Sequence, residues 1–223
     1  LSVLAQDKPK PLPKDFKSLK ALAEKGSARA QHNLGFMYYH GKGVARDHKE
    51  AVKWCRKAAL QGNARGQFSL GWMYLEGKGV LKDDKEAVKW YREAAEQGLA
   101  VAQYQLGWMY LEGKGVLKDD KESVKWYRKA ALQGFAIAQR NLGVMYSLGR
   151  GVQQDQMTAY AWAHIATVNG DKTAPKFKAF LATKMTPRQI TKAQALAKEM
   201  TKKNPKLLEN ETHPLTTPQS FSP

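Results

Sequence analysis

The sequence predicts an all-α protein of stacked helix pairs, and a period of 36 residues carries that prediction. The segments LGFMY, LGWMY, LGWMY and LGVMY begin at positions 34, 70, 106 and 142. In the same register, GKGV (three times) and GRGV begin at positions 41, 77, 113 and 149, and a tryptophan follows at 54, 90, 126 and 162. A period of roughly 20 to 50 residues that holds two helical patterns is typical of a solenoid, in which each repeat buries its apolar face against its neighbours.

The first helix of each repeat is predicted from apolar residues three or four positions apart. Ala30, Leu34 and Tyr38 lie along one stripe, which we expect to be buried. Gly35 lies at the edge of this stripe, and a glycine within a helix costs roughly 1 kcal/mol relative to alanine. We therefore expect the partner helix to approach closely at Gly35. The glycines of the following GKGV segment can adopt positive φ and end the helix.

The second helix of each repeat is predicted to place its tryptophan inward, beside small residues such as Ala51 and Ala58. We expect an aspartate near its start to cap free backbone amides. These aspartates are Asp47, Asp84, Asp120 and Asp155. Away from the tryptophan, Lys and Arg alternate with Glu, which predicts a solvated outer face with ion pairs three and four residues apart. A basic ligand-binding surface is the alternative interpretation.

The pattern A-x-x-x-LGxMYxxGxGV, then Asp, then AxxWxxxAAxxG resembles the Sel-1-like repeat family, which is related to the tetratricopeptide repeats. The resemblance covers residues 28–170 as four full repeats. It implies a right-handed superhelix of antiparallel helix pairs, and proteins that act as adaptors and scaffolds without a reaction of their own. Relatives with paired cysteines in each repeat differ from this chain, which has only Cys55.

The repeats also divide the chain into segments. Residues 1–14 contain Lys and Pro in alternation and predict a linker or the remnant of a signal peptide. Residues 15–170 form the solenoid, beginning with a half repeat, and residues 171–203 are expected to cap it with helices, the second starting after Thr186. Residues 204–223 contain four prolines and few large apolar residues, which predicts a flexible tail.

Charge and composition limit the partner without identifying it. The chain has 37 Lys and Arg against 20 Asp and Glu, a net charge of +17. Nucleic acid, an anionic surface or an acidic protein could all match this charge. Residues 63–98 carry six positive and six negative charges, so the middle of the chain is no continuous basic track. We therefore expect a protein or peptide partner, with nucleic acid or an anionic surface as the alternative, and a monomer.

The beginning of the sequence bears on where the protein works. Residues Leu1–Ala5 are apolar or small and resemble the end of a signal segment. We expect an exported bacterial protein, periplasmic or secreted, and cytoplasmic if this stretch is only an arbitrary boundary. No run of about 18 apolar residues occurs, so no transmembrane span is predicted.

A candidate partner-binding surface follows from the helix period. Residue 36 lies opposite the buried stripe of the first helix, and below we use the numbers of the first repeat, such as position 36, for the equivalent residues of every repeat. Its occupants are Phe36, Trp72, Trp108 and Val144, and position 32 alongside holds His32, Phe68, Tyr104 and Arg140. Polar residues flank them at Asn33, Ser69, Gln105, Asn141, His40, Glu76 and Glu112. First helices line the concave side of such superhelices, so this set is predicted to form an aromatic groove for a peptide or a partner helix. Alternatively, the neighbouring repeat covers position 36 or, more readily, position 32.

Residues suited to catalysis or metal binding are not brought together by the pattern. His32, His40 and His48 are eight residues apart and have no second ligand at helical spacing, and His164 fits a packed or surface histidine. We predict no catalytic residue, no metal and no cofactor, and a protein that is not an enzyme. A third possibility, after the scaffold and the basic binder, is a secreted hydrolase, which has been proposed for some relatives.

Overall fold

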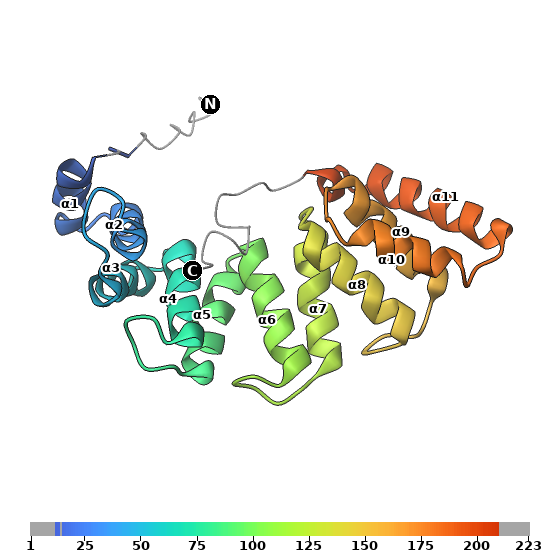
Figure 1. Ribbon diagram of the computed structural model, residues 1–223, viewed down its shortest axis with the longest axis horizontal. Coiled ribbons are helices and arrows are strands. Elements are labelled where there is room, and N and C mark those ends of the chain that lie inside the picture. The colour runs from blue at the N-terminus through green and yellow to red at the C-terminus, as the bar shows by residue number, and fades with distance from the viewer. Residues whose placement is uncertain (1–11, 14, 210–223) are drawn as a thin grey trace, which may run out of the picture. The chain divides into compact units, whose positions relative to one another are not determined.

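The computed structural model describes residues 12, 13 and 15–209, and every regular element in this part of the chain is helical (Figure 1). The chain divides into two compact units, Leu1–Asp83 and Asp84–Pro223, called unit 1 and unit 2 below. The predicted signal remnant and the last fourteen residues of the predicted tail lie outside the described residues. None of the described helices combines the length and apolarity that a membrane crossing requires.

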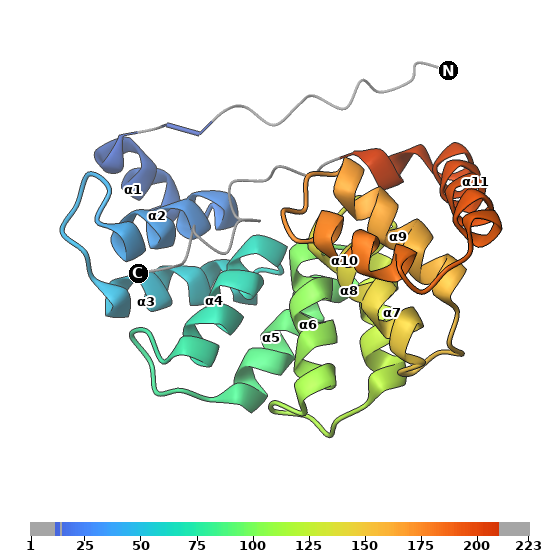
Figure 2. The same cartoon turned by 45° about the vertical axis from the view of Figure 1, so that its right-hand side comes forward.

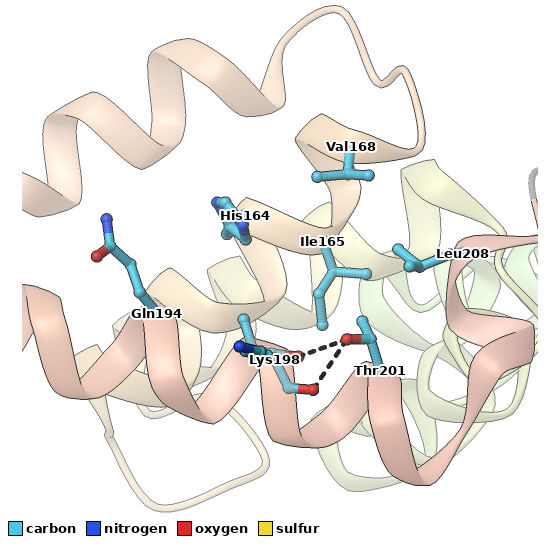
Figure 3. Close-up of a pocket in the computed structure, with 8 residues that line it drawn as sticks. His164, Ile165, Val168, Gln194, Lys198, Thr201 and Leu208 are labelled. Carbon is cyan, nitrogen blue, oxygen red and sulfur yellow. Dashed lines mark hydrogen bonds between the residues drawn. The ribbon is translucent and has the colours of Figure 1, made fainter.

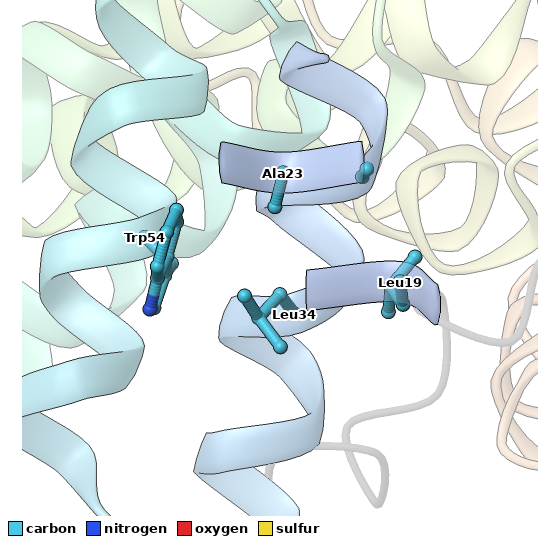
Figure 4. Packing of buried hydrophobic residues seen from close by; sticks show 5 residues of the cluster. Leu19, Ala23, Leu34 and Trp54 are labelled. Atoms are coloured by element: carbon cyan, nitrogen blue, oxygen red, sulfur yellow. The ribbon is translucent and has the colours of Figure 1, made fainter. Parts of the chain in front are cut away.

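Unit 1 contains the predicted half repeat, the first full repeat and the first helix of the second. Its helices are α1 (Phe16–Glu24), α2 (Ala28–His40), α3 (His48–Leu60) and α4 (Ala64–Glu76). Each helix packs on the next along the chain. Figure 4 shows the core at one end of this unit, where Leu19 and Ala23 of α1 meet Leu34 of α2 and Trp54 of α3. The side chains of Leu34 and Trp54 are buried, as predicted, whereas Tyr38 of the same stripe is half-buried.

Unit 2 continues the alternation and ends with the predicted cap. Its helices are α5 (Asp84–Glu96), α6 (Ala100–Glu112), α7 (Asp120–Ala131), α8 (Ala136–Leu148), α9 (Gln156–Val168), α10 (Ala174–Ala182), α11 (Pro187–Lys203) and the short 3₁₀ helix η1 (Pro205–Leu208). Helices α5 to α9 pack in sequence, and both α10 and α11 pack on α9 (Figure 2). The all-α repeat architecture is therefore confirmed.

Glycine in the middle of the first helix permits close contact with the second helix, as predicted. A Cβ atom on Gly35 would lie 2.5 Å from the Cys55 Sγ and 3.1 Å from the Ala51 carbonyl oxygen. A Cβ atom on Gly107 would lie 2.8 Å from the Tyr127 ring. Contacts this short are repulsive, so any larger residue would force the two helices apart.

The second glycine of the last three loops provides a contact between repeats that the sequence pattern did not reveal. Gly79 and Gly115 adopt φ of +76° and +67°. A Cβ atom on Gly79 would overlap the backbone carbonyl of His48, and one on Gly115 would overlap that of Asp84. Each carbonyl belongs to the first residue of the preceding second helix. The loops therefore pack directly on the repeat before them, and they do more than reverse the chain.

Aspartate capping occurs as predicted at Asp47 and Asp155, whereas Asp84 and Asp120 are the first residues of α5 and α7 and not their caps. Asp47 and Asp155 cap α3 and α9 through backbone amides two and three residues ahead. In α7, the cap is Asp119, and Asp120 is the first helical residue. Asp120 instead accepts two hydrogen bonds from Arg150 of the next loop, at 2.7 and 3.0 Å. The expected role of Asp120 was wrong because Asp119 occupies the period-matched position.

Buried glutamines connect successive repeats. One glutamine per first helix donates its side-chain amide to a carbonyl at the end of the preceding second helix. The pairs are Gln31 to Ala23 (3.0 Å), Gln67 to Ala59 (3.3 Å), Gln103 to Ala95 (3.1 Å) and Gln139 to Ala131 (3.1 Å). Each of these glutamines is at most 5% exposed. A buried amide group left without an acceptor is costly, so these bonds favour one stacking register.

The predicted cap begins as expected, but the first residues of the predicted tail pack against the repeats. Thr186 and Gln189 form the capping box that starts α11, as the sequence predicted. Residues 204–209, however, are ordered: Leu207 is buried, and its carbonyl oxygen accepts hydrogen bonds from Gln139 and Asn169. The prediction of a flexible tail from residue 204 was therefore wrong for this stretch, because two buried side-chain amides bind its backbone.

The loop contact at Gly115 can be tested with a matched glycine. Gly98→Ala should cost about 1 kcal/mol, because Gly98 also has positive φ but has open space around it. Gly115→Ala should lower the free energy of unfolding by at least about 2 kcal/mol more, since the added Cβ meets backbone atoms. Urea unfolding of both variants measures the difference. Equal losses would show that the loop does not need this contact.

Burial also predicts the chemical behaviour of Cys55. The Cys55 side chain is 1% exposed, and burial raises the pKa of its thiol to about 12. We expect it to be inert to a thiol reagent at pH 8 in the native protein and to react once the protein is unfolded. Ala45→Cys, which places a second thiol at an exposed site, is the positive control. Rapid native reaction at Cys55 would contradict the packing of α2 on α3.

Candidate partner-binding surface

The residues at position 36 retain exposed surface in both units. Phe36 and Trp72 lie on α2 and α4 of unit 1, and Trp108 and Val144 lie on α6 and α8 of unit 2. All four side chains are half-buried. A half-buried aromatic ring is held in place by its neighbours and still offers a face or an edge to a partner.

In unit 1, Phe36 and Trp72 belong to a larger group of rings, which we call the aromatic cluster: Phe36, Tyr39, His40, His48 and Trp72. The Tyr39 ring meets the Trp72 ring edge-on, with centroids 5.2 Å apart. It also contacts His40 and His48, at 4.9 and 4.8 Å. The Phe36 ring lies 4.1 Å from His40. The buried Tyr39 thus connects rings from three helices, and it was not among the predicted site residues.

The electrostatics of the aromatic cluster favour neutral imidazoles. Burial, followed by the charges of Lys42 and Arg46, lowers the pKa of His40. Burial also lowers the pKa of His48, with Lys78 and Arg46 adding to the effect and Asp47 opposing it. The Lys42 ammonium lies 5.1 Å from the centroid of the Phe36 ring. The surface therefore presents uncharged rings beside several cations.

In unit 2, the two occupants of position 36 differ in their surroundings. The Lys114 ammonium lies 4.5 Å from the centroid of the Trp108 ring, which matches the placement of Lys42 over Phe36. Val144 offers a smaller apolar surface. Tyr104, at position 32, stacks on Tyr127 at 5.7 Å and packs against Phe135 at 5.4 Å. Tyr104 is therefore mainly a packing residue.

Position 32 contributes less to the surface than the sequence suggested. His32 is 5% exposed, and its ring is within hydrogen-bond distance of Asn33 and of Ser69 on α4, both at 3.2 Å. Phe68 and Ser69 are each 2% exposed. Arg140 forms an ion pair with Asp171 at 3.0 Å. The alternative that a neighbouring repeat covers position 32 thus holds for His32, and burial removes Phe68 and Ser69 from the surface.

The remaining predicted residues stay at the rim. Asn33, Gln105 and Asn141 are half-buried, as is His40. Glu76 and Glu112 are exposed at the C-terminal ends of α4 and α6. The rim is therefore polar, and together with Lys42 and Lys114 beside the rings it carries both signs of charge.

The outer face of the second helices is largely occupied by contacts within the chain. Lys53, Lys89 and Lys125 pair with the glutamate three residues earlier, at 2.8, 3.6 and 2.9 Å. A further contact recurs between residues eighteen apart, in which an arginine donates a 2.7 Å hydrogen bond to a tyrosine hydroxyl of the next repeat. These pairs are Arg56–Tyr74, Arg92–Tyr110 and Arg128–Tyr146. The arrangement matches the predicted solvated face. The recurrence of Arg and Tyr eighteen residues apart was visible in the sequence and could have predicted these hydrogen bonds.

A separate cavity of about 390 Å³ lies between α9 and α11 (Figure 3). Its lining includes His164, Ile165, Val168, Lys198 and Leu208. His164 is half-buried, and burial together with Lys178 lowers its pKa. Across the described residues, no three His, Cys, Asp or Glu side chains are grouped so as to hold a metal ion. The cavity is mainly apolar in its lining.

Comparison with known proteins gives short matches to two curated proteins and several structural neighbours. The ERAD-associated E3 ubiquitin-protein ligase component HRD3B of Arabidopsis thaliana is 47% identical over 45 residues, which are 20% of this chain and 8% of that protein. The HRD3A component from the same plant is 44% identical over 45 residues and 7% of its length. The chain thus spans less than a tenth of these relatives.

Solved structures match over most of the chain. A Sel1 repeat protein from Oxalobacter formigenes has a TM-score of 0.71 and 39% identity, covering 82% of this chain and 78% of that one. A protective antigen of uropathogenic Escherichia coli with an SLR fold has a TM-score of 0.57 and 30% identity, covering 93% and 51%. An immunity protein from Pseudomonas aeruginosa, at 21% identity and a TM-score of 0.51 over 93% and 83%, shares the fold.

The family model gives the most direct assignment, because it follows the same period as the helix pairs. The Sel1 repeat model matches residues 28–63, 64–99, 100–135 and 136–171, which is more than half of the chain. Each matched segment holds one first helix and one second helix of the structure. This chain therefore belongs to the Sel1 repeat family.

Proposed function

We propose that this protein is a non-catalytic scaffold that binds an extended peptide or a protein segment on the first-helix surfaces around Phe36 and Trp72 in unit 1 and around Trp108 in unit 2. The observation that carries the proposal is the aromatic cluster of unit 1. There, Phe36 and Trp72 keep exposed surface while Tyr39 and His40 hold them in place. Fixed aromatic residues with a polar rim are where binding energy tends to concentrate.

The chemistry of the surface suggests the kind of segment that would bind. Lys42 and Lys114 each place an ammonium beside an aromatic ring of the surface. A segment with an apolar side chain next to a carboxylate would contact the ring and the ammonium together. Glu76 and Glu112 at the rim would disfavour uniformly acidic ligands. We therefore propose a mixed apolar and acidic segment of a protein as the ligand.

The named roles of relatives support a role in assembly. The plant proteins that share a 45-residue match are named as components of an E3 ubiquitin-protein ligase. That match covers about one repeat, so it supports protein binding in general and carries no particular partner over to this chain.

The aromatic surface can be tested by truncating one ring in each unit. The double variant Trp72→Ala/Trp108→Ala should keep its helical content by circular dichroism, with each change lowering the free energy of unfolding by roughly 2 kcal/mol because the rings are half-buried. It should lose the partner in a pull-down from the native organism, identified by mass spectrometry. Phe180→Ala removes an exposed ring outside this surface and should capture normally. Unchanged capture by the double variant would reject the surface.

Salt concentration separates the two kinds of partner in the same pull-down. Peptide binding through apolar rings should persist when salt is raised from 50 to about 200 mM, whereas binding to several phosphates should weaken by about a thousandfold. Loss of all capture at the higher salt would favour the nucleic-acid alternative.

The aromatic cluster should also respond to acid. Since the pKa values of His40 and His48 are lowered below 6.5 in the folded protein, the unfolded chain binds more protons as the pH falls. Stability is therefore complete above about pH 6.5 and declines as the pH passes below it toward the folded pKa values. The loss between pH 7.5 and 5.5, measured by urea unfolding, should be smaller in His40→Gln/His48→Gln. An equal loss in both proteins would exclude these two groups as its source.

A further inference from the structure

The C-terminal cap, residues 172–206, has a charge unlike that of the repeats. It contains ten Lys and Arg and a single carboxylate, Glu199. The cations are Lys172, Lys176, Lys178, Lys184, Arg188, Lys192, Lys198, Lys202, Lys203 and Lys206. All except Lys178 are exposed, and Lys178 is half-buried. The cap therefore presents a dense positive surface on α10, α11 and η1.

Carboxylates of the described residues leave most of this charge unpaired. Glu199 pairs with Lys203 at 2.6 Å. For the other nine cations, no carboxylate in the described part of the chain lies within 4 Å. In the repeats, by contrast, glutamates accompany the lysines of the second helices. Unbalanced like charges destabilise a folded domain, so their concentration here fits a partner that supplies the negative charge.

The free face of α10 adds an apolar element to this positive surface. Leu181 is buried against α9, whereas Phe180 is 50% exposed. Lys176 precedes Phe180 by one helical turn and so lies on the same face. The Lys184 ammonium lies 4.3 Å from the centroid of the Phe180 ring. An aromatic ring is thus displayed between two lysines.

We propose that this face of the cap docks on an anionic phospholipid surface. The ammonium groups of Lys176 and Lys184 would contact lipid phosphates, and the Phe180 ring would enter the boundary between headgroups and acyl chains. A nucleic-acid duplex offers phosphates to the lysines but leaves Phe180 in water. An anionic bilayer places an apolar layer beneath a negative surface and therefore matches both features. This surface is independent of the aromatic surface proposed above.

Sedimentation of the full chain with vesicles tests the charge requirement. Wild-type protein should bind vesicles of 70% phosphatidylcholine and 30% phosphatidylglycerol, and should bind pure phosphatidylcholine more than about tenfold more weakly. Lys176→Glu/Lys184→Glu should weaken binding to the anionic vesicles more than about tenfold. Lys118→Glu/Lys121→Glu, with the same change in charge at exposed sites outside the cap, should bind nearly as wild type. Equal losses in the two variants would show a general charge effect and overturn the site.

Phe180 is tested separately from charge. Phe180→Ala should weaken vesicle binding by about threefold to tenfold with no change in thermal stability, since half of the side chain is exposed. Wild-type binding by this variant would overturn the role of the ring. If the wild-type protein binds a 30-base-pair DNA duplex, loses it through Lys176→Glu/Lys184→Glu, and binds both vesicle types alike, the partner is nucleic acid and the proposal fails.

A polarity-sensitive dye locates the contact directly. Cys55 is buried, so a cysteine introduced at the exposed Ala179 is the site that a thiol dye labels in the native protein. Its emission should shift to shorter wavelength with anionic vesicles, because the neighbouring Phe180 enters the interface. The same dye at Gln153→Cys, in an exposed loop of unit 2, should not shift. A shift at both sites, or at neither, would contradict docking through α10.

Discussion

In the first, third and fourth repeats, the two helices can pack only as closely as the glycine in the first helix allows, and much of the fold depends on that contact. At Gly35, the space is taken by Cys55 and the backbone of Ala51, and at Gly107 it is taken by the Tyr127 ring. This packing brings Leu34 and its equivalents to zero exposure and encloses the tryptophan of each second helix. Because no disulfide in the described residues holds the fold, van der Waals contact at these positions is its main source of rigidity.

Close packing also determines which part of the first helix remains available to a partner. In unit 1, one side of α2 contacts α3 through Gly35, and Gln31 reaches back to the end of α1. His32 faces Ser69 of α4. The region around Phe36 and His40 keeps exposed surface, and the Tyr39 ring packs against His40. The proposed binding surface on α2 is thus a part of the helix that its contacts with α1, α3 and α4 leave accessible.

The cations of the repeats and those of the cap differ in whether they have partners within the chain. In the repeats, lysines pair with glutamates on their own helix, and arginines bind tyrosine hydroxyls of the next repeat. These contacts use cations to support stacking. In the cap, Lys203 is the one cation paired with a carboxylate among the described residues, so the rest of its positive charge is available for an external anion. The two proposed surfaces therefore differ in chemistry, one aromatic with a mixed rim and the other basic with a single exposed ring.

The sequence by itself determined the helix pairs, their period, the buried Leu34 and Trp54, and the close approach at Gly35, because these depend on local periodicity and on the repetition of one residue type at one position. It also predicted that position 36 stands apart from the core. Only the tertiary structure decided that His32 and Phe68 are buried, that Tyr39 supports the surface, and that residues 204–209 pack on Gln139 and Asn169. Each of these depends on contacts between residues distant in sequence, such as those between α2 and α4, and the geometry that brings them together is set by how successive repeats stack.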